Sequence, residues 1–172
     1  MEKIDLYDND RLPIKKVKVL DEPLAFGENR LSVHVCIFNS NGEMLIQQRV
    51  KTKRKWPNLW DISLGGGVQA GETSRDAAKR ELKEELGLDY DFSNERPYLT
   101  VNFANGFDDI FFLNMDFNAN TLILQKEEVA KAKWASKEEI ERMLDAGEFI
   151  PFVKSFILSL FDLKNQRGMI IM

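Results

Sequence analysis

Three glutamates stand close together near the middle of the chain. Glu84 and Glu85 follow Glu81 by three and four residues, so on a helix the three side chains fall within an arc of about 100°. Carboxylates this close repel one another by a few tenths of a kcal/mol per exposed pair, and a purely structural helix gains nothing from that. Because Mg²⁺ takes oxygen ligands, the spacing favours a metal site over the alternative, a solvated helix face.

The residues around these glutamates predict the helix that must carry them. Thr73 and Asp76 have the spacing of an N-terminal capping box. Gly87 can adopt the left-handed conformation that ends a helix near Leu86. Three consecutive glycines at 65–67 precede the helix, so the chain there can approach other groups closely.

The segment 66–88 resembles the Nudix box, Gly-x5-Glu-x7-Arg-Glu-U-x-Glu-Glu-x-Gly-U with U aliphatic, and matches it at every defined position. The matching residues are Gly66, Glu72, Arg80, Glu81, Leu82, Glu84, Glu85, Gly87 and Leu88. The resemblance implies an α/β/α sandwich with a mixed sheet, in which the box forms a loop–helix–loop. It also implies Mg²⁺- or Mn²⁺-dependent hydrolysis of a diphosphate bond in a small substrate, often a nucleoside diphosphate derivative.

The same resemblance implies roles for the residues of the box. The metal ligands would be Glu81, Glu84, Glu85 and Gly66. The bound cation would neutralise the diphosphate and lower the pKa of the attacking water. Arg80 would pair with Glu72 and orient the box. Glu81, Glu84 and Glu85 are all candidates for the general base, which in some members lies on a late loop, as Glu127 and Glu128 do here.

A basic segment bears on the substrate. Residues 47–60 resemble the Nudix branch that contains isopentenyl-diphosphate isomerase, in which an Arg and a Lys four residues later grip the diphosphate. These positions fall on Arg49 and Lys53, and the planar fork of Arg suits phosphate oxygens. A solvated basic loop is the alternative for the cations of this segment.

The chemistry of the isomerase fits this chain poorly. Its cysteine and two metal-binding histidines fall on Gly65, Gly67 and Arg30. The single His and single Cys, His34 and Cys36, lie on one face of a predicted strand, where we expect core or half-buried residues. We therefore favour a hydrolase, with isomerase-like activity and a non-catalytic nucleotide-sensing module as alternatives.

Aromatic and acidic residues further along the chain are additional candidates for the site. Phe103 and Phe107 flank an Asn-Gly turn and could contact a nucleobase, with sheet core as the alternative reading. We take Phe107 as the substrate-binding candidate. Asp108 and Asp109 occupy positions at which this branch sometimes has a further acidic metal ligand.

The rest of the sequence predicts one α/β domain over 1–172, with a polar extension or hairpin at 1–29 and a Nudix core at 30–163. A turn is expected at 8–10. Ser136 and Glu139 should open a helix that Gly147 closes, and Pro151 suits the first turn of a last helix. Strands are expected at 31–38, 43–49, 61–64, 98–104, 109–117 and 132–135.

Composition excludes several classes of protein. The 172 residues carry a net charge of −4, from 24 Lys and Arg against 28 Asp and Glu, which argues against a dedicated nucleic-acid partner. One cysteine rules out an internal disulfide. The charged first residues and the lack of a long apolar run predict a cytoplasmic protein that does not engage a membrane. Monomer and homodimer both stay open.

Overall fold

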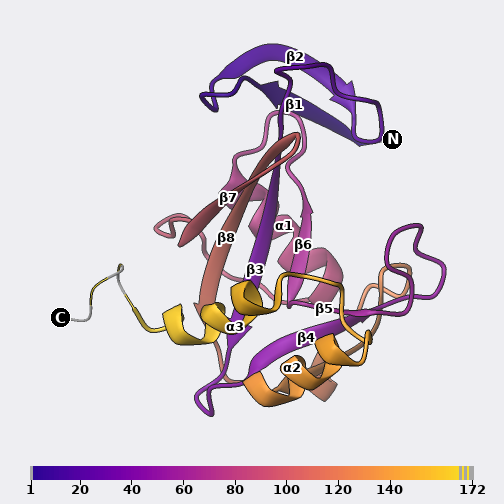
Figure 1. The fold of residues 1–172 in the computed structure, drawn as a ribbon, viewed down its shortest axis with the longest axis vertical. Coiled ribbons are helices and arrows are strands. Elements are labelled where there is room, and N and C mark those ends of the chain that lie inside the picture. The colour runs from indigo at the N-terminus through magenta and orange to yellow at the C-terminus, as the bar shows by residue number, and fades with distance from the viewer. Residues whose placement is uncertain (1, 167, 169, 171–172) are drawn as a thin grey trace. The chain divides into compact units, whose positions relative to one another are not determined.

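A computed structural model of the chain describes residues 2–166, 168 and 170 (Figure 1). The described chain forms two compact units. The first unit runs to Val35 and includes Leu64–Phe111, and the second contains Cys36–Ser63 and the chain from Phe112 onward. Strands β3 (Arg30–Phe38) and β8 (Gly106–Asn114) each begin in the first unit and end in the second.

The first unit begins with a β-hairpin. Strands β1 (Lys3–Tyr7) and β2 (Pro13–Val19) pair antiparallel. Asp8 closes the turn between them, because its Oδ1 accepts from the N–H of Asp10 at 3.0 Å and of Leu12 at 2.8 Å. The turn expected at 8–10 is therefore confirmed, and the N-terminal segment contains a hairpin.

Two antiparallel strand pairs frame the box in the first unit. Strand β6 (Leu64–Gly67) pairs with residues 32–35 of β3. Strand β7 (Leu99–Phe103) pairs with the start of β8 across the expected Asn-Gly turn. Helix α1 (Ser74–Leu86) buries its apolar side chains in this unit, whose core includes Ala78, Leu82, Leu86, Phe92 and Phe111.

The caps of α1 are those expected from the sequence. Thr73 accepts from the N–H of Asp76, and the Asp76 carboxylate accepts from the N–H of Thr73. Gly87 ends the helix with φ of 69°, a conformation in which a side chain would be strained. The box therefore forms the expected loop–helix–loop.

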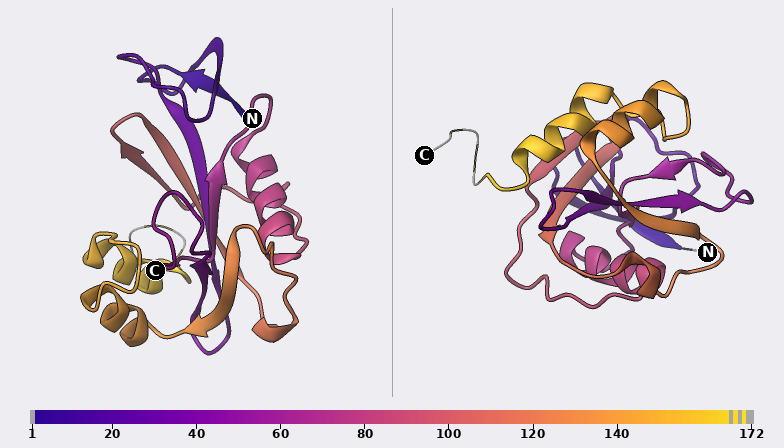
Figure 2. Two further views of the ribbon diagram at one scale, coloured as in Figure 1. Left: turned by 90° about the vertical axis from the view of Figure 1, so that its right-hand side faces the viewer. Right: turned by 90° about the horizontal axis from the view of Figure 1, so that it is seen from below.

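The second unit contains the remaining strands and helices. Strand β4 (Met44–Arg49) pairs antiparallel with β5 (Trp60–Asp61) and with β9 (Val129–Ala135), and Trp60 makes a parallel bridge to Phe149. A 3-10 turn spans Ala119–Thr121. Helices α2 (Lys137–Asp145) and α3 (Lys154–Leu163) lie side by side (Figure 2).

The predicted strand at 61–64 is instead two strands, β5 and β6, with Ile62 and Ser63 between them. The Ser63 hydroxyl donates to the Leu45 carbonyl at 2.6 Å and accepts from the Ile37 N–H at 2.8 Å. A side chain thus replaces the backbone in the hydrogen bonds at this point, and the strand is interrupted.

The last helix begins at Lys154 and not near Pro151. Residues 148–150 are held by Trp60, whose N–H donates to Glu148 and whose carbonyl accepts from Ile150. These bonds hold residues 148–150 outside a helix, and the Phe152 N–H donates to the Ile150 carbonyl in a tighter turn, so the chain becomes helical only from Lys154. Ser136 caps α2 as expected.

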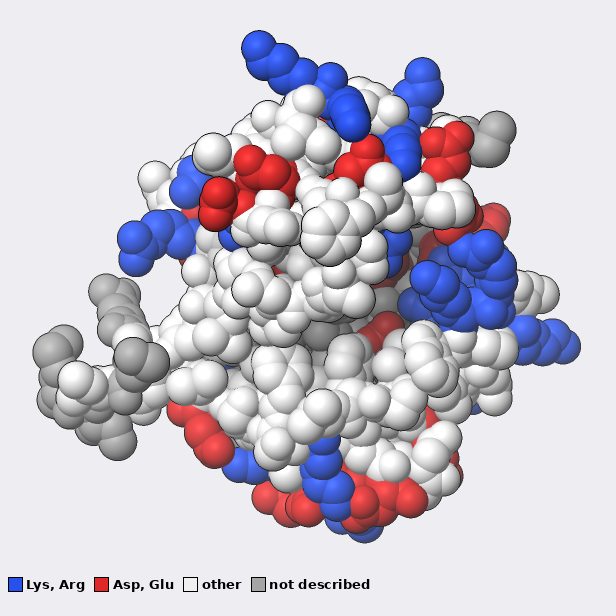
Figure 3. Space-filling model, turned by 45° about the horizontal axis from the view of Figure 1, so that its top comes forward, with Lys and Arg blue, Asp and Glu red and all other residues white. Residues whose placement is uncertain are grey.

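None of the described helices has the length and apolar character needed to cross a membrane. The face drawn in Figure 3 carries both basic and acidic side chains among many uncharged ones. The mild net charge therefore does not arise from a uniformly acidic surface.

Candidate active site

Gly66 sets how closely α1 approaches β6. It lies opposite Val33 in the β3–β6 pair, and a Cβ built on it would overlap the Glu81 carboxylate. Only glycine therefore leaves room for the Glu81 side chain against the strand. Glu81, the first of the three closely spaced glutamates, is thus held at this point because residue 66 has no side chain.

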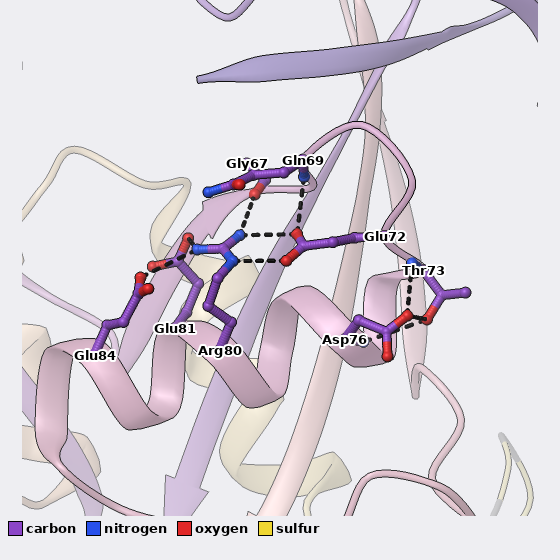
Figure 4. A network of polar contacts seen from close by, with 8 residues as sticks. All are labelled: Gly67, Gln69, Glu72, Thr73, Asp76, Arg80, Glu81 and Glu84. Carbon is purple, nitrogen blue, oxygen red and sulfur yellow. Dashed lines mark hydrogen bonds and ion pairs between the residues drawn. The ribbon is translucent and has the colours of Figure 1, made fainter. Parts of the chain in front are cut away.

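Arg80 contacts three of the four glutamates of the box, Glu72, Glu81 and Glu84, as Figure 4 shows. Its Nε donates to Glu72 Oε1 at 2.7 Å, and its Nη2 donates to Glu72 Oε2 and to the Gly67 carbonyl, both at 3.0 Å. Its Nη1 donates to Glu81 Oε1 at 2.7 Å and to Glu84 Oε2 at 3.2 Å. One guanidinium thus ties the loop, the strand and the helix together.

The ionisation of this cluster follows from these contacts. The hydrogen bond with Glu72 raises the pKa of Arg80 above its already high ordinary value, so this residue stays charged. Burial alone would raise the pKa of Glu72, but hydrogen bonds from Arg80 and from the Gln69 N–H lower it. Burial raises the pKa of Glu81, because removing a carboxylate from water disfavours its charged form.

The carboxylate oxygens of the box are of the kind that binds a hard divalent cation. Oxygens of Glu81 and Glu84 both converge on one positive atom, Arg80 Nη1, and carboxylate oxygens are the ligands that Mg²⁺ prefers. Glu84 is half exposed and Glu85 is buried. Within residues 2–166, 168 and 170, no three His, Cys, Asp or Glu side chains are already grouped so that they could hold a metal.

The acidic candidates on β8 already have partners in the first unit. Asp108 Oδ2 lies 2.6 Å from His34 Nδ1, and Asp109 is paired with Arg11 and accepts from Thr100 Oγ1 at 2.7 Å. As expected, His34 is half buried, and Cys36 is fully buried. The His34 ring fills the space beside Gly65, where a Cβ would overlap it.

The aromatic candidates differ in exposure. Phe107 is buried, with 8% of its surface exposed, and the Arg11 guanidinium lies 5.8 Å from its ring centroid. Phe103 is 37% exposed and lies beneath the Arg30 guanidinium. Phe107 thus has the burial of a sheet-core residue, and its contact with substrate stays a prediction.

Arg49 and Lys53, the two diphosphate-binding candidates of the basic segment, lie in the second unit, and each faces an acidic residue. Lys53 pairs with Glu128, one of the late-loop base candidates. Arg49 Nη1 lies 3.5 Å from Asp61 Oδ2, and its Nε donates to the Lys55 carbonyl at 3.2 Å. No spacing in the sequence links Lys53 to a residue 75 positions away, so only the fold reveals this pair.

Comparison with known proteins gives a consistent result. The NUDIX domain model matches residues 28–156. A Listeria innocua protein described as an uncharacterised Nudix hydrolase is 48% identical over 165 residues, which are 96% of each chain. An isopentenyl-diphosphate isomerase of Brevibacterium linens is 28% identical over 156 residues, covering 86% of this chain and 84% of that protein.

A solved structure supports the same grouping. The crystal structure of a Deinococcus radiodurans protein matches with a TM-score of 0.75 at 26% identity, covering 96% of this chain and all of that one. The expected α/β sandwich is therefore confirmed, as is the resemblance to the branch related to the isomerase. On the domain match and the Listeria relative together, the chain belongs to the Nudix hydrolase family.

Proposed function

We propose that this hydrolase cleaves a diphosphate bond in a small substrate, a nucleoside diphosphate derivative, with Mg²⁺ as cofactor and Mn²⁺ as its substitute. The observation that carries the proposal is the convergence of Glu81 and Glu84 on one positive atom of Arg80, beside a glycine that admits Glu81. Such a cluster of oxygens suits a divalent cation that also binds phosphate.

The residues of the box divide the work between them. Glu81, Glu84, Glu85 and Gly66 would hold the cation, which when bound neutralises phosphate charge and makes water a better nucleophile. Arg80 and Glu72 hold the loop against the helix through their two hydrogen bonds. A box carboxylate accepts the proton of the attacking water, and Glu84 is the more exposed of Glu81 and Glu84.

Residues of the second unit would bind the diphosphate. Arg49 and Lys53 each lie beside a carboxylate, so their charges are held in place before a substrate arrives. Phe107 remains our candidate for contact with the substrate. The single-domain organisation, the cytoplasmic location and the choice between monomer and homodimer stay predictions from the sequence.

Hydrolysis is favoured over isomerisation by the packing at Gly65. The isomerase has a cysteine at the equivalent position, whereas here a Cβ would overlap the His34 ring. The ring is itself held by Asp108 at 2.6 Å. The chain thus has neither the cysteine nor the space for one.

A substrate panel tests the proposal. The chain is incubated with Mg²⁺ and with nucleotides, sugar nucleotides and prenyl diphosphates, and released phosphate and diphosphate are measured. We expect turnover that Glu84→Gln and Glu85→Gln each lower by at least about 100-fold, whereas Glu148→Gln, an exposed carboxylate of the second unit, changes it little. Turnover equal to the parent in both box variants would contradict the proposal, as would double-bond migration without phosphate release, or tight metal-independent binding without product.

A further inference from the structure

A polar cavity lies in the first unit, at the opposite end of α1 from Glu84. Its volume is about 520 Å³. Three arginines from separate segments line it, together with three hydroxyl side chains and one carboxylate: Arg11, Arg75, Arg96, Thr73, Ser74, Thr100 and Asp109. At a rise of 1.5 Å per residue, Ser74 is about 10–15 Å along the helix from Glu81 and Glu84. The cavity is therefore separate from the proposed metal site.

The single carboxylate of the cavity is already neutralised. Asp109 is completely buried, and its two oxygens are bound by Arg11 and by Thr100 Oγ1. Arg11 is also held by a hydrogen bond from its Nη1 to Thr100 Oγ1 at 3.1 Å. The Arg11–Asp109 pair cancels in charge, and Arg75 and Arg96 leave two positive charges at the cavity.

These two arginines keep donors available for a ligand. Arg75 Nη1 donates a hydrogen bond to the Ser93 carbonyl at 3.1 Å. This bond positions the guanidinium and leaves its other N–H groups available to a ligand. Arg96 makes no hydrogen bond or ion pair with any residue that the structure describes. Like charges gathered without a counterion repel one another, so an anion in the cavity would relieve an unfavourable arrangement.

We propose that this cavity binds an anion of the phosphate class. The planar fork of Arg donates two parallel hydrogen bonds to phosphate oxygens, and the Ser74 hydroxyl can add a third donor. The anion has two sources, free phosphate or diphosphate and a distal phosphate group on the substrate. Only the second source rests on the proposed function.

Calorimetric titration of diphosphate and of phosphate into the chain tests the site, in buffer with a chelator so that no metal bridges the anion to the box. We expect saturable binding that Arg96→Gln and Arg75→Gln each weaken about tenfold, as loss of a charge-assisted hydrogen bond predicts. Arg142→Gln is the matched control, because Arg142 is an exposed arginine of α2 outside this cavity. Glu84→Gln should bind the anion as the parent does.

Several results would overturn the site. They are the absence of saturable binding, an equal loss in Arg142→Gln and Arg96→Gln, which indicates unspecific charge attraction, or acetate binding as tightly as diphosphate. Both arginine variants exchange exposed side chains, and a thermal melt verifies that they fold. The titration measures binding and not turnover. Its result is therefore independent of whether the chain hydrolyses a diphosphate.

The source of the anion is then resolved with a substrate from the panel. If the occupant is a distal phosphate of the substrate, Arg96→Gln raises KM about tenfold with kcat little changed. If the occupant is a free anion, KM is unchanged while the loss of diphosphate binding persists. Either pattern supports the site once the titration has shown binding.

Discussion

The guanidinium of Arg80 meets the carboxylate of Glu72 at two points, Nε to Oε1 at 2.7 Å and Nη2 to Oε2 at 3.0 Å. Both side chains are mostly shielded, with exposed fractions of 18% and 20%. A two-point pair of this kind fixes orientation as well as distance. It therefore sets the angle at which the loop after β6 meets α1, and with it the positions of the remaining carboxylates.

The strength of this pair can be measured with a double-mutant cycle. Glu72→Gln and Arg80→Met, alone and combined, should give a coupling of about 2 kcal/mol in urea unfolding, between the values of exposed and buried pairs. The Lys137–Asp162 pair of the second unit, with exposed fractions of 33% and 70%, is the control and should give less than about 1 kcal/mol. Equal coupling in the two cycles would contradict a special role for Arg80.

Gly66→Ala should disturb the metal site. The new Cβ would overlap the Glu81 carboxylate, so that side chain must move. We expect Mn²⁺ affinity, measured by calorimetry, to fall about 10- to 100-fold, as for a displaced ligand. Gly67→Ala is the comparison, because its Cβ would lie 3.3 Å from Leu20 and needs only a small shift. A Gly66→Ala chain that bound Mn²⁺ like the parent would remove Glu81 from the ligand set.

Arg49→Gln and Lys53→Gln should weaken substrate binding more than turnover. Loss of one charged hydrogen bond to phosphate predicts a rise in KM of about tenfold. Lys51→Gln removes a charge from the same loop at an exposed position and controls for general electrostatics. An equal rise in KM in all three variants would contradict direct contacts of Arg49 and Lys53 with the substrate. The loop would then act only through its overall positive charge.

Lowering the pH should reduce the stability of the first unit, because it protonates Glu28. Hydrogen bonds from Lys18 and from the Ala25 N–H lower the pKa of this buried carboxylate from 4.5 to about 2. A depressed pKa in the folded state stabilises the protein above about pH 4.5, and that contribution is lost as the pH falls toward 2. The difference in Tm between parent and Glu28→Gln should therefore be largest near neutral pH and shrink below pH 4.5.

Local signals predicted the box and its helix well. Thr73, Asp76 and Gly87 act through neighbours within a turn of themselves, so their roles could be inferred from spacing. Strand limits were less accurate where a side chain intervened, as Ser63 does between β5 and β6. Nothing local marks Trp60 as the residue that delays the last helix by bonding to residues 148–150.

The long-range pairs escaped prediction for the same reason. The partners Arg11 and Asp109 are separated by 98 positions, and Lys53 and Glu128 by 75. Such pairs depend on strand pairing and on loop paths that no periodicity records. The family motif identifies the box carboxylates, but the convergence of Glu81 and Glu84 on one atom of Arg80 depends on the folded chain.

The neighbouring glycines of β6 impose different evolutionary constraints. Successive positions of a strand point to opposite faces, so a side chain at Gly65 would meet His34 and one at Gly66 would meet Glu81. A mutation at Gly65 can be compensated at a second site, since Gly65→Ala combined with His34→Ala should restore the fold. Compensation at Gly66 would require loss of a box carboxylate. We therefore expect substitutions to be tolerated at Gly65 when His34 also changes, but not at Gly66 while Glu81 is retained.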